Sequence, residues 1–173
     1  MTIWRVIPDE VNAQRGRLVG PCFDEMCALG KNGVIPEAEG QEGDGKTPSG
    51  IYPFRHVFFR PDREQIPITR LSTQASSPSL GWCDAPESKH YNKLVRLPHG
   101  EGHEKLWRDD HLYDLILVIG HNDDPVVSGL GSAIFVHVAR DGFRPTLGCV
   151  ALEVSALRKL LRLIEPEDQL KIG

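Results

Sequence analysis

The sequence predicts a single domain, residues 1–173, with a mainly β fold and one α-helix near the C-terminus. Its 17 glycines and 13 prolines exceed the usual share of these residues and indicate many turns. Apolar segments of strand length recur along the chain, whereas residues 153–164 repeat their apolar positions with the period of a helix. A chain of 173 residues is long enough to bury one sizeable core.

The composition argues against several classes of function. Hydrophobic residues make up 40% of the chain and charged residues 25%, as in ordinary soluble globular proteins. The net charge of −4 provides no basic field for a nucleic acid. No apolar run reaches the length of a transmembrane helix. The first ten residues lack the pattern of a secretory signal, so we expect a cytoplasmic protein with no nucleic-acid or membrane partner.

The chain has four cysteines, Cys22, Cys27, Cys83 and Cys149. Their spacing is neither that of a zinc ribbon nor that of a redox motif. We therefore expect reduced thiols, as in cytosolic proteins. Cys22 and Cys27 are interpreted as packing residues.

Several segments have the length and composition of β-strands. In residues 51–59 a two-residue alternation places an aromatic stripe on one face, formed by Tyr52, Phe54, His56 and Phe58. Residues 112–119 are almost continuously apolar, which predicts a strand buried on both faces. The predicted strands are residues 3–7, 51–59, 66–71, 112–119, 133–139 and, at an edge, 169–172. Polar loops are predicted at residues 32–49 and 72–79.

Residues 153–164 form the clearest helix. Glu153 suits the positive end of the helix dipole, and Pro166 ends the helix. Basic side chains lie opposite the apolar stripe, which consists of Val154, Leu157, Leu160, Leu161 and Ile164.

The segment from Phe135 to Leu152 carries the residues that we expect to perform chemistry. An apolar strand delivers His137, a short connection follows, and the chain returns through Cys149 to a second apolar run. An imidazole can take the proton of a nearby thiol, and the thiolate can then attack a carbonyl carbon. Gly148 lacks a Cβ, which would let a substrate carbonyl approach the backbone N–H groups around the thiol.

Other interpretations of these residues stay open. Cys149 could be a small buried hydrophobic residue, as cysteines in apolar strands usually are. Cys83 is a competing thiol, although no glycine directly precedes it and no strand histidine lies near it in sequence. His121 follows a strand and a glycine, which makes it the rival candidate for the base.

The irregular stretch from residue 81 to residue 92 gathers amphipathic side chains. Asp84, Tyr91 and Asn92 are of the kinds that line ligand clefts. They could equally attach a long loop to the body of the protein.

His99, His103 and His111 lie in a polar stretch and could supply zinc ligands. Two glycines between the first two histidines argue against a rigid helix that presents both on one face, and the spacing is not that of His-Glu-x-x-His. We therefore expect no metal. The stretch is predicted to be a surface loop that leads into a short helix at residues 104–107.

The segment around Cys149 resembles the active-site motif of the L,D-transpeptidase catalytic-domain family. That motif has a strand histidine followed by Ser/Thr-x-Gly-Cys and an apolar residue. The matching residues are His137, Thr146, Gly148, Cys149 and Val150. The turn Lys-Thr-Pro-Ser-Gly at residues 46–50 is also similar to one in the family, and the resemblance extends from about Gly43 to the C-terminus.

The chain departs from the family pattern at two positions. Leu147 stands where many members have a second histidine, and Ala151 stands where many have an arginine. The spacing from His137 to Thr146 is also shorter than in the commonest form of the motif. The chemistry therefore transfers from the family better than the substrate contacts do.

The resemblance implies a β-sandwich of two packed, mixed sheets and cysteine acyl chemistry on the stem peptides of peptidoglycan, with no cofactor. The bond attacked would join a diamino acid to a D-residue. Cys149 would form the acyl-enzyme, His137 would move the proton, and the N–H groups of Gly148 and Cys149 would hold the oxyanion. Candidate substrate contacts are Lys46, Asp84, Tyr91, Asn92, His121, Arg144, Thr146 and Leu147, and Thr146 would order the loop.

Water or an amine can resolve such an acyl-enzyme. We expect water, and hence a cytoplasmic L,D-carboxypeptidase that trims terminal D-Ala from soluble muropeptides during recycling. A transpeptidase that forms cross-links or exchanges D-amino acids is the alternative. A catalytically inert module that holds anionic peptides, or a zinc hydrolase that uses the three histidines, are further alternatives.

Overall fold

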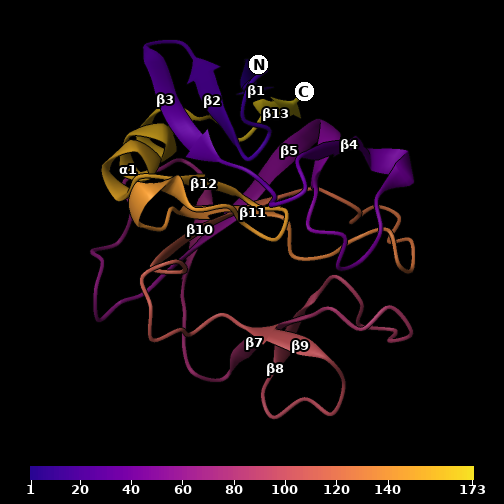
Figure 1. Cartoon of the computed structure of the whole chain (residues 1–173). Coiled ribbons are helices and arrows are strands. Elements are labelled where there is room, and N and C mark those ends of the chain that lie inside the picture. The colour runs from indigo at the N-terminus through magenta and orange to yellow at the C-terminus, as the bar shows by residue number, and fades with distance from the viewer.

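Thirteen strands and one α-helix make up the structure, a computed structural model that describes residues 1–173 (Figure 1). The strands are β1 (Ile3–Pro8), β2 (Arg15–Gly20), β3 (Phe23–Ala28), β4 (Val34–Pro36), β5 (Thr47–Phe59), β6 (Ser72–Ala75), β7 (Leu80–Cys83), β8 (Leu94–Arg96), β9 (His103–Lys105), β10 (Leu115–Ile119), β11 (Phe135–Val138), β12 (Val150–Leu152) and β13 (Gln169–Ile172). The helix is α1 (Val154–Leu163). The predicted mainly β class is confirmed.

The strands form two sheets of unequal size. The large sheet runs in the order β10, β11, β12, β3, β2, β1, β13, β5 and β4, with β6 also paired to β5. Because β10 pairs with β5 as well, this sheet curls round and closes on itself. It is mixed, since β1–β13 and β11–β12 are parallel and most other pairs are antiparallel. The small sheet, β8-β7-β9, is antiparallel and lies below the large one in Figure 1.

Two hydrophobic cores result from this arrangement. The larger core lies within the closed sheet and includes the apolar face of α1. The second core lies where the small sheet packs against β5, β10 and β11. Strand β10 serves both cores, with Leu115, Leu117 and Ile119 on one side and Ile116 and Val118 on the other. The predicted strand with two buried faces is therefore confirmed.

Helix α1 forms where its apolar period predicts. The Glu153 side chain accepts hydrogen bonds from the backbone N–H groups of Ser155 and Ala156, and so caps the helix. Leu157 and Leu160 are fully buried in the larger core. This helix closes one side of the core that supports β11 and β12.

The predicted aromatic stripe of β5 is interrupted. Relative to β10, β5 has an extra residue between Phe54 and Val57. Tyr52 and Phe54 face the larger core, whereas Phe58 faces the second core. The ring of His56 packs edge-on against that of Phe58, with their centroids 4.7 Å apart. Placing all four rings on one face was wrong, because a bulge reverses the alternation of a strand.

Between residues 60 and 80, the structure has a loop where a strand was predicted and a strand where a loop was predicted. Residues 66–71 form no strand, since Pro67 cannot donate a backbone hydrogen bond, and Ile66 and Ile68 are exposed. The strand of this region is β6, which lies in a segment predicted to be a loop and pairs in parallel with β5.

Three other predictions are corrected by strand pairing. Residues 104–107 form no helix, because the chain there pairs with β7 as β9. The final strand, β13, is not an edge strand but lies between β1 and β5. The polar segment 32–49 contains β4 and the start of β5, which pair in parallel. In each case a partner distant in sequence overrides the local preference.

Candidate active site

A cavity of about 270 Å³ opens between the large sheet and the loops that connect it to the small one. Both Cys149 and His137 line it, as do His121 and Thr146. The rest of its wall comes from residues in segments 40–48, 104–113 and 130–134, together with Ile35, Asp84, Arg140 and Leu147.

Parallel pairing of β11 and β12 places Cys149 beside Phe135 at the start of β11. Val136 faces Val150 in this register, so Cys149 precedes the paired residues by one position. Its sulfur accepts a hydrogen bond from the Phe135 N–H at 3.3 Å and donates one to the Ala133 carbonyl at 3.2 Å. The residue is only 8% exposed. The thiol therefore has a fixed position at the wall of the cavity.

His137 lies on the same face of β11 as Phe135, as the alternation predicts. Its Nδ1 lies 2.8 Å from the Val138 carbonyl oxygen, which favours the tautomer with the proton on Nδ1. The edge of the ring meets the ring of Tyr113, with centroids 5.3 Å apart. The tautomer leaves Nε2 as the nitrogen that can accept a proton.

Burial controls the charge of both groups. It raises the pKa of the Cys149 thiol to about 12, and the nearby Glu104 carboxylate acts in the same direction. Burial also lowers the pKa of the His137 imidazole to about 4. At neutral pH the pair is therefore a thiol and a neutral imidazole, and not an ion pair.

The loop before Cys149 is closed by one hydroxyl group. Thr146 Oγ1 accepts a hydrogen bond from the Gly148 N–H at 3.0 Å and donates one to the Cys149 carbonyl at 2.7 Å. The Gly148 N–H is therefore already engaged and is not a free oxyanion donor, contrary to the expectation from sequence. The Cys149 N–H has no acceptor within the protein and remains for that role.

The backbone conformation and the close packing of the loop both require a glycine at position 148. Its φ of 140° lies in the region that favours glycine. A Cβ at this position would lie 2.7 Å from the Lys46 carbonyl oxygen. The glycine thus lets the loop pack closely on the segment that enters β5.

A carboxyl–phenol pair near the thiol was missed by the sequence analysis. The Tyr113 hydroxyl donates to both carboxylate oxygens of Glu104 at 3.1 Å. Desolvation raises the pKa of both groups. Arg108 lies over the Tyr113 ring, 5.2 Å from its centroid. The segment had been predicted as a loop and helix, which gave no indication that its side chains face Cys149.

A second carboxylate, Glu42, also lines the cavity. It accepts hydrogen bonds from the Tyr91 hydroxyl and, at 2.7 Å, from Ser132. Burial raises its pKa. The Tyr91 hydroxyl in turn accepts from the Gly131 N–H at 3.0 Å. Tyr91 therefore does not line the cavity but is hydrogen-bonded to two residues that do, Glu42 and Gly131.

Of the amphipathic residues between 81 and 92, Asp84 lines the cavity and Asn92 does not. The Asn92 amide accepts from the Trp82 indole at 2.9 Å and donates to the His121 and Asn122 carbonyls. This buried amide attaches the loop to the body of the protein, which was the alternative interpretation.

His121 is buried at the cavity wall without a hydrogen-bond partner for either ring nitrogen. A carboxylate oxygen of Glu37 lies 3.8 Å from Nε2, beyond hydrogen-bond distance. Burial lowers the pKa of His121 to about 4. A neutral ring with free nitrogens on a cavity wall is suited to contact a ligand.

The cavity has three basic side chains, Lys46, Arg108 and Arg140. Arg108 is bound to Asp110 through two hydrogen bonds. Lys46 and Arg140 make no ion pair. Arg144, predicted as a substrate contact, does not line the cavity, whereas Leu147 does and is 73% exposed.

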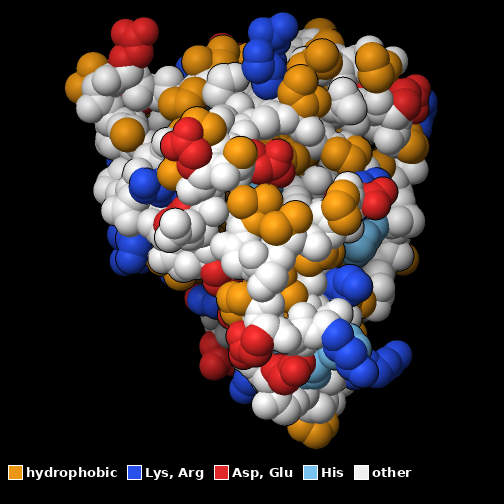
Figure 2. All heavy atoms as spheres, turned by 90° about the vertical axis from the view of Figure 1, so that its right-hand side faces the viewer, with side chains coloured by type: hydrophobic (Ala, Val, Ile, Leu, Met, Phe, Trp, Pro, Cys, Tyr) orange, Lys and Arg blue, Asp and Glu red, His pale blue; other side chains and the backbone are white.

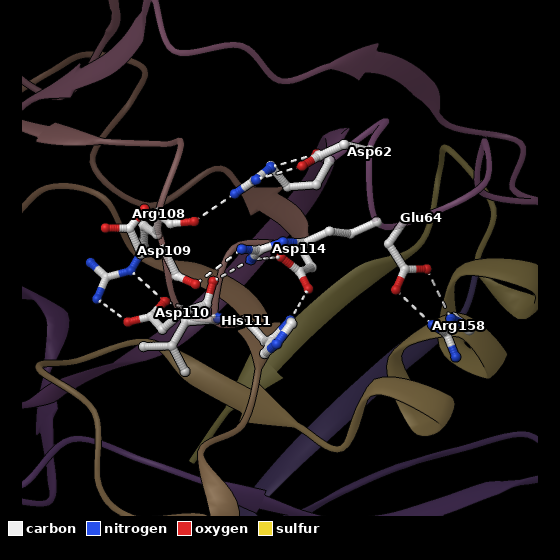
Figure 3. A network of polar contacts seen from close by, with 11 residues as sticks. Asp62, Glu64, Arg108, Asp109, Asp110, His111, Asp114 and Arg158 are labelled. Carbon is white, nitrogen blue, oxygen red and sulfur yellow. Dashed lines mark hydrogen bonds and ion pairs between the residues drawn. The ribbon is translucent and has the colours of Figure 1, made fainter.

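The segment that carries Arg108 and Tyr113 is fixed by a polar network (Figure 3). Arg63 donates to the Asp110 carbonyl at 2.7 Å and to the Asp114 carboxylate at 2.9 Å. His111 points to Asp114, with Nδ1 2.6 Å from the carboxylate. This network holds His111 away from His99 and His103, so the three histidines do not form one zinc site.

The other thiols do not line the cavity. Cys83 is fully buried in a small cluster with Ala85 and Val95. Cys22 is exposed and Cys27 is buried in the larger core. All four cysteines are free. Cys149 is thus the thiol that shares a cavity with a strand histidine.

The sequence model of the YkuD family, described as the L,D-transpeptidase catalytic domain, matches residues 4–172. The chain belongs to this family. No curated protein and no solved structure shows a significant match. The L,D-transpeptidase domains are cysteine-dependent enzymes of peptidoglycan, so the substrate of this member derives from peptidoglycan. No helix here has the length and apolar character needed to cross a membrane.

One departure from the L,D-transpeptidase motif lies directly beside the strand histidine. Ala151 is 1% exposed, lies on β12, and is paired with His137 on one side and Ala28 on the other. Paired residues of neighbouring strands share a face, so Ala151 lies beside His137 on the face of β12 opposite to Val150 and Leu152. The basic residues of the cavity wall must therefore come from other elements.

Proposed function

We propose that Cys149 is the nucleophile and His137 the base of an L,D-carboxypeptidase that acts on peptidoglycan stem peptides. The observation that carries this proposal is the position of both side chains on one cavity, with His137 in the tautomer that leaves Nε2 free. An inert peptide-binding module has no use for this arrangement.

The reaction begins when Nε2 of His137 takes the thiol proton and the sulfur attacks the carbonyl carbon of the diamino acid residue. The Cys149 N–H stabilises the oxyanion. The imidazolium then gives its proton to the departing amine of D-Ala, and the acyl-enzyme remains. Because the resting pair is neutral, substrate binding must bring the proton transfer and the attack together.

Recognition of the terminal D-Ala is assigned to the two basic residues without acidic partners. Lys46 and Arg140 lie on the cavity wall and can pair with the carboxylate of the leaving residue. Acidic residues of the same wall, among them Glu42 and Asp84, can attract the free ammonium group of the diamino acid. The mixed charge of the cavity suits a substrate that carries both signs.

Water is proposed as the acceptor because access to the nucleophile is narrow. Cys149 is 8% exposed at the wall of a cavity of about 270 Å³. A water molecule needs little space beside the acyl-enzyme once D-Ala has left, whereas a second stem peptide needs far more. Exchange with a small free D-amino acid is the strongest competing reaction.

The enzyme is also proposed to work in the cytoplasm on soluble muropeptides. Four free thiols suit a reducing compartment. In that compartment acceptor peptides are dilute and water is abundant. Cell fractionation with an antibody against the protein tests this, and recovery in the envelope fraction would contradict it.

The decisive experiment offers purified enzyme a disaccharide-tetrapeptide in water enriched in heavy oxygen and analyses the products by mass spectrometry. Hydrolysis yields a tripeptide with one heavy oxygen atom and free D-Ala. The Cys149→Ala variant is the control and must give neither. Cross-linked dimers or exchanged D-residues at low acceptor concentration would identify a transpeptidase, and unchanged substrate would favour a binding module.

A further inference from the structure

A group of metal-binding side chains lies in the part of the protein that contains the small sheet, outside the cavity. Cys83 at the end of β7, His99 and Glu101 each offer one ligand atom, and these atoms all lie within 4.8 Å of one another. Figure 2 shows histidine side chains among basic and acidic ones at the lower end of the molecule, where the small sheet lies. Neither the proposed reaction nor the family assignment uses these residues.

His99 has a nitrogen that lacks a partner. Its Nε2 is buried and forms no hydrogen bond, although such atoms are nearly always satisfied in folded proteins. The closest acidic oxygen, on Glu101, is 3.4 Å away. Two ligands bound at about 2.1 Å to one tetrahedral zinc ion would lie roughly 3.4 Å apart. The spacing therefore suits a shared cation better than a direct hydrogen bond.

The other two ligands are held in place by their neighbours. Cys83 is fully buried, and its backbone N–H and carbonyl are bonded to Lys93 and Asn92. The Glu101 carboxylate accepts a hydrogen bond from the Ser88 hydroxyl, which orients it. This preorganisation lowers the cost of gathering the ligands around a metal.

Two further imidazoles flank the cluster. The rings of His90 and His103 lie with their centroids 5.7 Å and 5.8 Å from that of His99. His103 Nδ1 is 2.8 Å from the Glu101 carbonyl oxygen, which leaves its Nε2 as the free acceptor. A fourth ligand, either one of these rings or a water molecule, is thus close by.

We infer that Cys83, His99 and Glu101 bind one zinc ion. A thiolate, an imidazole and a carboxylate together are a donor set that zinc accepts in tetrahedral geometry. The thiol of Cys83 releases its proton to solvent as the Zn–S bond forms. The ion would tie β7 to the loop before β9, and so fix the neighbouring Asp84 and Glu104 on the cavity wall.

A zinc ion would add stability to the end of the small sheet that carries Cys83. The strands of this sheet are only three or four residues long, and the apolar cluster around Cys83 contains three buried residues. Leu80 and Trp82 of β7 pack in the second core, but the end of the sheet that carries Cys83 buries little apolar surface, which provides limited stability. Zinc binding adds its own free energy to the folding of this region.

The test is titration of chelator-treated, full-length protein with Zn²⁺ by isothermal calorimetry. We expect one ion per chain, and a thiolate-to-metal charge-transfer band when Co²⁺ is used instead. His99→Ala and Glu101→Gln should each weaken zinc binding by more than the roughly 10–100-fold that follows loss of a group bonded only to a metal ligand. His111→Ala and Cys22→Ser, which alter a histidine and a thiol outside the cluster, should bind as the wild type does.

Substitution of the buried Cys83 could disturb folding, so Glu101→Gln, at an exposed position, is the deciding variant. Circular dichroism establishes that each variant is folded before titration. Unchanged zinc affinity in both His99→Ala and Glu101→Gln overturns the inference. So does a wild-type protein that binds no zinc, or a cobalt form that lacks the thiolate band.

Discussion

At the scale of single residues, burial sets the chemistry of Cys149 and His137. Desolvation disfavours the charged form of each group, so it raises the pKa of the thiol and lowers that of the imidazole. Both shifts oppose formation of a thiolate–imidazolium pair before substrate binds. In the proposed mechanism, the thiol therefore loses its proton only when substrate is bound.

The raised pKa of Cys149, about 12, predicts its alkylation behaviour. The reactive thiolate is scarce at neutral pH and increases as the pH rises. Iodoacetamide should therefore label Cys149 much more slowly than the exposed Cys22 at neutral pH, with a rate that keeps rising into the alkaline range. Peptide mass spectrometry measures both sites in one sample. A fast rate at Cys149 that does not depend on pH would reveal a preformed thiolate.

His137 is expected to be the base and His121 a ligand-contacting residue. General-base assistance contributes about 10²–10⁴-fold to a rate, so His137→Ala should lose kcat on that order. His121→Ala should mainly raise KM, because the ring lines the wall and neither of its nitrogens is bonded to the thiol. Steady-state kinetics on a tetrapeptide distinguish the two. The reverse pattern would make His121 the base.

At the scale of elements, the loop between β11 and β12 determines the position of Cys149, the proposed nucleophile. Thr146 closes the loop by two hydrogen bonds, and Gly148 lets it approach the Lys46 carbonyl. Because the two strands are parallel, the loop must run back along β11 before β12 begins opposite Val136. A change in this loop should therefore affect the site before it affects the whole fold.

Gly148→Ala should lower both stability and activity. The new Cβ would meet the Lys46 carbonyl at 2.7 Å and would also have an unfavourable φ. A loss of about 1–3 kcal/mol in the free energy of unfolding is expected. Gly43→Ala is the matched control, since its φ is also positive but nothing lies within 4 Å. Equal losses in urea unfolding would show that the close approach is unimportant.

Helix α1 should contribute to stability through its buried face. Leu160 is fully buried in the larger core, so Leu160→Ala should cost about 2–5 kcal/mol. Leu163, on the same helix, is 38% exposed, and Leu163→Ala should cost much less. Thermal and urea unfolding measure both variants. Similar costs at the two positions would contradict the observed orientation of the helix.

At the scale of the whole molecule, the two sheets pack on hydrophobic cores of different size. The large sheet closes on itself around a core of 25 buried residues, whereas the core it shares with the small sheet has 11. Figure 1 shows the small sheet as a separate layer joined by long connections. The cavity lies between these unequal parts, so its walls can differ in mobility.

Hydrogen exchange should reflect this difference. Amides of β7, β8 and β9 should exchange faster than those of β10 and β11, because short strands with few buried neighbours open locally at lower cost. Exchange measured by mass spectrometry on metal-free protein tests the prediction. Equal protection of the two sheets would show that the molecule opens as one cooperative unit.

Local sequence patterns were sufficient where the residues concerned are neighbours along the chain. The amphipathic period of α1, the apolar run of β10 and the alternation that separates His137 from the aliphatic face of β11 all appear in the structure. The bulge in β5 and the pairing of β6 and β9 did not, since they depend on partners that lie far away in sequence.

The sequence by itself determined the chemical groups and the family: a thiol, a strand histidine and a Thr-x-Gly-Cys loop. Tertiary structure alone decided which groups meet. It brought Glu104 and Tyr113 to the cavity, left Arg144 outside, engaged the Gly148 N–H and placed Cys83 beside His99. The physical reason is that residue types are local, whereas burial, hydrogen-bond partners and charge neighbours arise only when distant segments pack together.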